Sequence, residues 1–149
     1  MKNLFNASDV QELKNRINQL SSTAKRQWGK MEPAQMLAHC CVPLELATGK
    51  KSSPRSLLGR ILGPLAKPRF VGPKPFPKNS PTDKNFIITG QRDFDAEKKR
   101  LLQLIDEFFA GGEAGCTQHP HPFFGKLTPQ QWASSQYKHL DHHMTQFGV

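Results

Sequence analysis

Residues 128–147 read TPQQWASSQYKHLDHHMTQF, and this stretch carries most of the information about the fold. Thr128, Pro129 and Gln131 match the N-cap residue, first-turn proline and capping-box glutamine with which helices begin. Apolar side chains then return at helical intervals, at Trp132, Leu140, Met144 and Phe147. The stretch therefore predicts a helix over 129–147 with one buried face.

Three other segments show the same amphipathic periodicity, so the sequence predicts further helices at about 8–21, 33–48 and 94–110. Ser8 and Gln11 have capping-box spacing, and Pro33 suits a first helical turn. Pro43 is expected to bend the second helix or to end it early. Four such helices without convincing strand pairs predict an all-α four-helix bundle that spans 1–149 as a single domain.

Residues 50–84 differ from the rest of the chain in charge and in proline content. Nine Lys and Arg residues against a single acid, Asp83, give this segment a net charge of +8, while the whole chain carries +9. The segment also holds seven of the twelve prolines. Because proline at this density disfavours a long helix, we expect a long, irregular Pro/Lys-rich insertion between the second and third bundle helices. Within it we expect only a short helix at 56–62, and after it an extended segment at 85–89.

The basic segment 50–84 has two interpretations. It could be an anion- or nucleic-acid-binding module, or a solvated loop whose charges bind nothing specific. Only Phe70 and Phe76 are available there to stack on bases, and no zinc-finger or RNA-recognition signature is present. These observations disfavour a nucleic acid as partner.

Several classes of protein are disfavoured by the rest of the sequence. No apolar run is long enough for a transmembrane helix, and the first residues lack the apolar core of a secretory signal. The three cysteines, two of them adjacent, form no sensible disulfide framework. We therefore expect a cytoplasmic protein with no membrane partner.

The histidines are the strongest functional signal. His139 and His143 lie four residues apart, so both leave one face of the predicted helix, one turn apart, as in helical metal sites. His39, between apolar Met36 and Val42, could supply a third ligand from a facing helix. His142 competes through its three-residue spacing from His139. The alternative also stands, because an isolated pair with this spacing is common without a metal, and a lone His39 is typical of a core histidine.

Three segments resemble a known family. WGKMEPAQMLAHC at 28–40, HPFFGKLTP at 121–129 and YKHLDHH at 137–143 are similar to the DinB/YfiT-like superfamily of metal-dependent hydrolases, and in particular to an uncharacterised bacterial subfamily. The resemblance implies a four-helix bundle that holds a divalent metal, zinc or nickel, on His39, His139 and His143. It also implies chemistry with a low-molecular-weight thiol, because some members of the superfamily are thiol-dependent isomerases and transferases.

A three-histidine site leaves a coordination position open, which is the catalytic arrangement. No carboxylate lies one helical turn from a candidate ligand, which favours thiol transfer over hydrolysis because a thiol held on a metal needs a general base less. Other residues expected to line the pocket are Gln35, Gln136, His121, His142 and Phe123. The expected substrate is a small molecule, drawn in by the basic segment if it is anionic. A metal-dependent sensor that catalyses no reaction is an alternative function. The sequence is also compatible with a homodimer.

Overall fold

The computed structural model describes residues 1–83 and 86–149, and the expected all-helical class is confirmed in these ranges, which contain five α-helices and no β-strand. The helices are α1 (Ala7–Gln19), α2 (Pro33–Ala47), α3 (Leu57–Val71), α4 (Phe94–Gly111) and α5 (Pro129–Gln146), with a short 3-10 turn, η2 (Glu113–Gly115), after α4. Lys84 and Asn85, where the expected insertion ends and the expected extended segment begins, lie outside the described residues.

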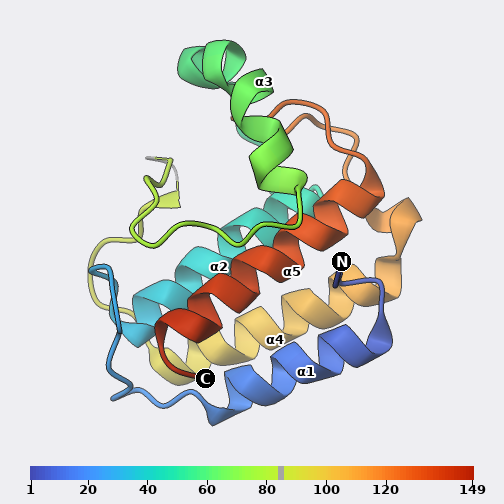
Figure 1. Ribbon diagram of the computed structural model, residues 1–149. Coiled ribbons are helices and arrows are strands. Elements are labelled where there is room, and N and C mark those ends of the chain that lie inside the picture. Colours follow the sequence, from blue (N-terminus) through green and yellow to red (C-terminus); the bar gives the residue numbers. More distant parts are fainter. Residues whose placement is uncertain (84–85) are drawn as a thin grey trace.

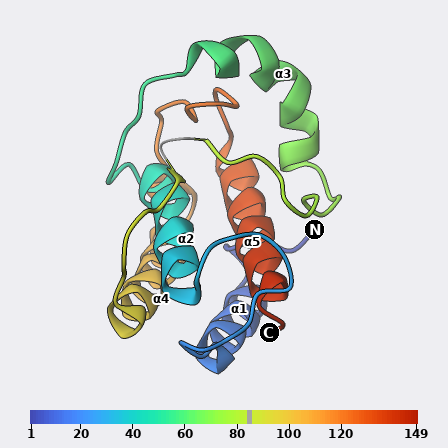
Figure 2. The same cartoon turned by 90° about the vertical axis from the view of Figure 1, so that its left-hand side faces the viewer.

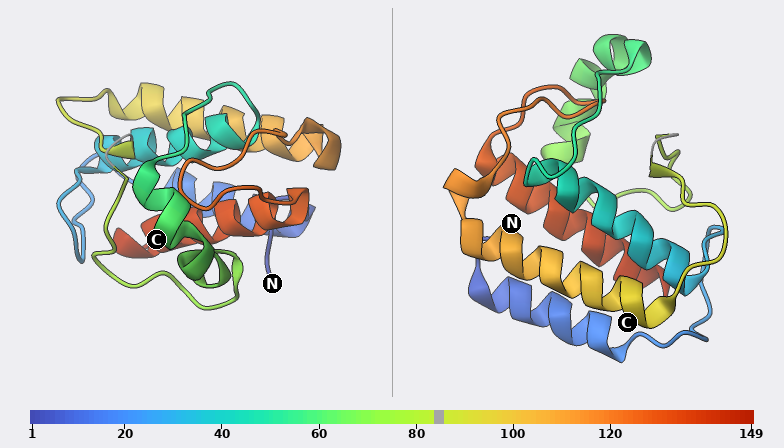
Figure 3. Two further views of the ribbon diagram at one scale, coloured as in Figure 1. Left: turned by 90° about the horizontal axis from the view of Figure 1, so that it is seen from above. Right: turned by 180° about the vertical axis from the view of Figure 1, so that it is seen from behind.

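Four of the helices lie side by side, and α3 stands apart from them (Figure 1). Helix α2 packs against α4 and α5, and α1 packs against the same two helices. The views from above and behind show the same grouping (Figure 3). Their apolar stripes meet in one core, in which the largest fully buried side chains include Trp132, Leu13, Ile17, Met36, Leu37, Leu44, Leu101, Ile105, Leu140 and Met144.

The helix ends follow the local sequence closely, with one difference at the first helix. Thr128 Oγ1 accepts a hydrogen bond from the Gln131 backbone N–H at 3.2 Å, and Gln131 accepts one from the Thr128 N–H, so α5 begins where the capping residues predict. Helix α1 begins at Ala7, because the side chain of Asn6 caps the N–H groups of Ser8 and Asp9. The expected cap at Ser8 was therefore wrong by two residues. Pro43 lies within α2, which continues to Ala47.

The short helix expected at 56–62 within the irregular segment is longer than predicted, because α3 continues to Val71, so the prediction of irregular structure was wrong for residues 63–71. This fifteen-residue helix contains Pro64 and Pro68, and it bends along its length (Figures 1 and 2). Each proline deprives the carbonyl four residues earlier of its N–H partner. Both prolines are exposed, so water can hydrogen-bond to the freed carbonyls on this side of the helix and the helix is not forced to end.

Both ends of α3 are attached to the rest of the molecule. Ser56 caps its first turn, accepting a hydrogen bond from the Gly59 N–H. At the other end the buried Lys138 of α5 donates from Nζ to the carbonyls of Arg69, Gly72 and Lys74, at 3.0, 2.7 and 3.2 Å. A cation at this place satisfies carbonyls that the helix itself leaves without partners. Helix α3 is therefore held in a defined position above the four packed helices.

None of the helices in the described ranges combines the length and the apolar character needed to cross a bilayer.

Candidate metal centre

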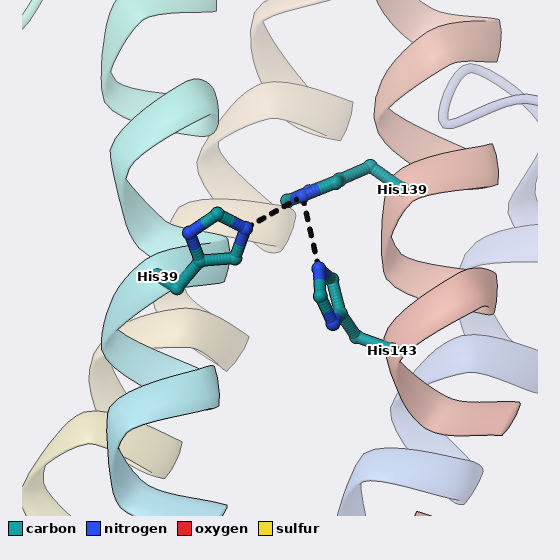
Figure 4. Close-up of side chains that lie close together, drawn as sticks. All are labelled: His39, His139 and His143. Carbon is teal, nitrogen blue, oxygen red and sulfur yellow. Dashed lines mark hydrogen bonds between the residues drawn. The ribbon is translucent and has the colours of Figure 1, made fainter. Parts of the chain in front are cut away.

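Three histidines from two helices point their Nε2 atoms at one another (Figure 4). His39 of α2 places Nε2 3.0 Å from Nε2 of His139, and His143 places its own Nε2 3.2 Å from that same atom. All three candidate ligand atoms lie within 4.8 Å of one another. His139 and His143 reach one point because they lie one turn apart on α5, and His39 faces them because α2 packs against α5. This group could hold a metal ion.

The outer nitrogen of His39 determines which tautomer that ring adopts. Its Nδ1 lies 2.9 Å from the backbone carbonyl oxygen of Phe86. Because a carbonyl only accepts hydrogen bonds, His39 must carry its proton on Nδ1, and its neutral ring leaves a bare lone pair on Nε2. The lone pair therefore points into the centre of the group.

His143 is oriented in the same way by a side-chain amide. Its Nδ1 lies 2.8 Å from Oε1 of Gln146, and Gln146 Nε2 donates to the Trp28 carbonyl at 2.7 Å. That carbonyl fixes which end of the amide is the nitrogen, so the oxygen faces His143 and its ring carries the proton on Nδ1. Gly29 makes the approach of Gln146 feasible, because a Cβ at Gly29 would lie 2.5 Å from Gln146 Nε2.

The donor set fits a divalent cation better than it fits hydrogen bonds among the rings alone. Two bare Nε2 atoms face His139, whose Nε2 can donate a single proton, and His139 Nδ1 is buried without a hydrogen-bond partner among the described residues. A cation bound to all three Nε2 atoms would use every lone pair. Tetrahedral ligands at zinc–nitrogen distances lie about 3.3 Å apart, close to the two separations observed here.

Burial keeps these imidazoles neutral, which is the form that binds metals. It lowers the pKa of His39 below its ordinary value, although the hydrogen bond to Phe86 opposes the shift. It also lowers the pKa of His143 to about 3 and that of His139 well below the ordinary range, with the neighbouring histidines adding to both effects. No proton therefore has to be displaced from the rings at neutral pH for an ion to bind.

Of the five residues expected to line the pocket, two lie beside the three histidines and three have structural roles. Gln136, one turn before His139 on α5, is buried and its Oε1 has no hydrogen-bond partner among the described residues. His142 is half-buried beside the group, with its ring centroid 5.2 Å from that of His143. Gln35 completes the cap of α2, accepting from the Glu32 N–H and donating to the Gly90 carbonyl.

The expected pocket residues His121 and Phe123 belong to a turn next to the site. His121 Nδ1 accepts hydrogen bonds from the backbone N–H groups of Phe123 and Phe124, and desolvation lowers the pKa of His121 to about 4. Phe123 is half-buried, and its backbone supports α3. We assign both residues to the structure of the turn, not to the group of three histidines.

Aromatic rings from α3 and from the segments that follow it pack around this turn. Phe70 of α3 stacks on Phe124 with a centroid separation of 3.8 Å, and Phe76 stacks on Phe70. Phe86, whose carbonyl holds His39, lies edge-on to His121. Phe70 and Phe76 therefore contribute apolar surroundings to the region of the site, and Phe86 contributes one hydrogen-bond acceptor.

No carboxylate belongs to the group among the described residues. Asp141, although on α5, pairs with Arg16 at 2.6 Å, Glu45 pairs with Lys51 and Arg100, and Glu32 pairs with Arg26. The chain's own thiols are also unsuited to act as nucleophiles. All three cysteines are buried, and burial raises the pKa of Cys41 to about 12 and that of Cys116 to about 11.

Three contributors to the site were not recognised in the sequence. Gln146 is three residues after His143, so its spacing alone could have suggested the contact. The carbonyls of Phe86 and Trp28 carry no such signal, because any residue supplies a backbone carbonyl. They reach the site only through the course of two loops.

The chain was compared with known proteins and with family models. No curated protein and no solved structure matches it. One family model, described as a protein of unknown function (DUF1569), matches residues 2–148. The chain therefore belongs to the DUF1569 family.

Proposed function

We propose that the protein is a metal-dependent enzyme in which His39, His139 and His143 hold a divalent cation, zinc or nickel, for the activation of a thiol or of water. The observation that carries this proposal is the orientation of the outer nitrogens. His39 and His143 each donate a hydrogen bond from Nδ1 to an oxygen acceptor, so that their bare Nε2 atoms converge on His139. Such outer partners are typical of metal-ligating histidines.

A cation held by three nitrogens, with a coordination position left open, would lower the pKa of a bound water to about 7 or would hold a bound thiol as its thiolate. The protein's residues would orient the reactant. Gln136 Oε1 and Trp132 Nε1 are buried polar atoms without hydrogen-bond partners among the described residues. Both lie on the face of α5 that carries His139 and His143, three and seven residues before His139. Unpaired buried polar groups of this kind are suited to a ligand's hydrogen bonds.

Thiol transfer is the reaction that we favour over hydrolysis. The carboxylates that could serve as a general base for water are engaged in ion pairs elsewhere. A thiol nucleophile would have to come from outside the chain, because the cysteines are buried and protonated. A low-molecular-weight thiol meets this requirement, and the excess of Lys and Arg in residues 50–84 would attract an anionic one.

The proposed architecture is a four-helix bundle formed by α1, α2, α4 and α5 as a single domain, of the kind found in the DinB/YfiT-like superfamily. The pairwise packing of these four helices supports it, as does the origin of the ligands from α2 and α5. Helix α3 is then an addition to the bundle.

The first test is elemental analysis of the untagged protein beside His39→Ala, His139→Ala and His143→Ala. We expect close to one equivalent of zinc or nickel in the wild type and its loss in each variant, because two remaining imidazoles bind far more weakly than three. His119→Ala is the matched control, because His119 is exposed and lies outside the group. Wild-type protein that takes up no metal, even after reconstitution, would refute the proposal.

A second measurement separates an enzyme from a metal-dependent sensor. The metal-loaded protein is screened for transfer of small thiols to electrophilic acceptors, with His139→Ala as the blank. We expect Gln136→Leu to bind metal normally and to lose turnover, because Gln136 is placed to contact the reactant and not the ion. A metal-loaded protein that catalyses neither thiol transfer nor ester hydrolysis would leave a binding function and contradict the enzymatic part of the proposal.

A further inference from the structure

The outward face of α3 is an unusual concentration of exposed aliphatic side chains. Leu57, Ile61 and Leu65 are 78%, 73% and 80% exposed, and Leu58 and Leu62 are exposed beside them. Their spacing places all five within one arc of the helix. Figure 2 shows that α3 stands above the packed helices. The exposed fractions of these side chains show that no other element of the described chain covers this face.

Helix α3 cannot rotate to bury its apolar face, because its opposite face packs directly on the backbone of a neighbouring turn. Gly59 and Gly63 are buried, and they pack against the backbone of the turn that contains Phe123. A Cβ at Gly63 would lie 2.1 Å from the Phe123 carbonyl oxygen, and one at Gly59 would lie 2.7 Å from Phe123 Cα. Only glycine permits so close an approach. Lys138 holds the far end of the helix, so the aliphatic face is presented outward in a fixed orientation.

Positive charge accompanies this face. Helix α3 contains no acidic residue, and Arg60 and Arg69 are exposed on it without an ion pair among the described residues. A second copy of the chain would bring the same charges together, which disfavours self-association through α3. Aliphatic side chains offer no stacking platform for bases, which disfavours a nucleic acid.

We propose that α3 is a membrane-surface helix, which lays Leu57, Leu58, Ile61, Leu62 and Leu65 into the interface of an anionic lipid bilayer while its arginines contact the lipid headgroups. An exposed aliphatic face with basic residues and no acids is the chemistry that such an interface takes up. The sequence alone predicted no membrane partner. That expectation rested on the lack of a spanning segment and of a secretory signal, and a helix that lies on the membrane surface needs neither. The inference is independent of the metal centre.

The test is cosedimentation of the full-length protein with vesicles of phosphatidylcholine and with vesicles in which phosphatidylglycerol replaces half of it. We expect binding to the anionic vesicles only. The triple variant Leu57→Asn/Ile61→Asn/Leu65→Asn should lower the partition coefficient by about tenfold or more, because it removes the inserted aliphatic groups. Arg60→Gln/Arg69→Gln should lower it by about fivefold for each charge removed.

Arg92→Gln/Lys99→Gln is the matched control, because it removes two exposed charges far from α3 in sequence and should bind like the wild type. Folding of each variant is checked by circular dichroism. Leu65→Trp supplies a gain of signal, since its added emission should shift to the blue with anionic vesicles and be quenched by brominated lipid.

Four outcomes would overturn the proposal. One is a wild-type protein that binds neither kind of vesicle. Another is vesicle binding that the triple Asn variant leaves unchanged, which would mean that the binding is electrostatic and does not involve the aliphatic side chains. A third is a dimer that the triple variant dissociates, which would make the face a contact between copies. The fourth is salt-dependent binding of DNA or RNA, lost in Arg60→Gln/Arg69→Gln, by a protein that ignores lipid.

Discussion

At the scale of single residues, the candidate site depends on where each imidazole keeps its proton. Oxygen acceptors hold the Nδ1 protons of His39 and His143, and the buried Nδ1 of His139 has no such partner among the described residues. The three rings are therefore not equivalent. His139 is positioned by packing and by its two neighbours, whereas the other two are oriented by groups outside the ligand set.

Replacing Gln146 should weaken metal binding without removing a ligand. In Gln146→Leu the His143 ring loses its acceptor, and we expect metal affinity to fall by about 10- to 100-fold. Competition with a chromophoric chelator measures the change. Gln103→Leu makes the same substitution on the exposed face of α4 and should have no effect. Equal affinities for wild type and Gln146→Leu would mean that the amide does not orient His143.

His121 should make the stability of the protein depend on pH. Its pKa is about 4 in the folded protein, so the unfolded chain takes up the proton first as the pH falls below 6.5. The stabilising contribution is complete above pH 6.5 and is lost as the pH falls towards 4. Between pH 7 and pH 5 the loss should be about 2 kcal/mol.

The comparison that isolates this effect is His121→Asn, whose side-chain oxygen can still accept the two backbone N–H groups but does not titrate. Urea denaturation of both metal-free proteins at pH 7 and pH 5 should show the smaller change in the variant. If both proteins lose the same free energy of unfolding, His121 is not the group responsible.

At the scale of elements, α3 shows how a helix can persist where its composition argues against one. Its prolines lie on exposed positions, its glycines face the turn at Phe123, and residues outside the helix satisfy its last carbonyls. The helix therefore depends on contacts with the rest of the molecule more than on intrinsic propensity.

Adding a single methyl group at Gly63, where α3 packs on the turn that contains Phe123, should detach this helix. In Gly63→Ala the new Cβ would overlap the Phe123 carbonyl oxygen, and we expect a loss of about 1–3 kcal/mol in the free energy of unfolding. Amide hydrogen exchange in α3 should become faster. Gly111→Ala is the matched control, because it lies in α4 with nothing within 4 Å of the added atom, and it should be neutral or slightly stabilising. An unchanged exchange rate in α3 would show that the packing of Gly63 on this turn does not hold the helix in place.

At the scale of the whole molecule, the ligands join α2 to α5, elements that are 100 residues apart at His39 and His139. An ion bound only by the folded protein should stabilise it by about 2.7 kcal/mol at a free concentration 100 times the dissociation constant. Thermal denaturation with zinc and with a chelator measures this. The stabilisation should persist in His119→Ala and vanish in His139→Ala, and an equal shift in both variants would indicate binding outside the group.

The helical class and most helix ends could be predicted from the amino-acid sequence, because capping residues and apolar periodicity act over three or four neighbouring positions. The sequence also predicted that His139 and His143 share one face, since four residues are close to one helical turn. Three features became visible only in the folded molecule. His39 meets the other two histidines, Gln146 and the carbonyls of Phe86 and Trp28 orient two of the rings, and the helix in the proline-rich segment continues to Val71. Those outcomes depend on contacts between distant residues, and in part on backbone groups that every residue carries, so no local pattern encodes them.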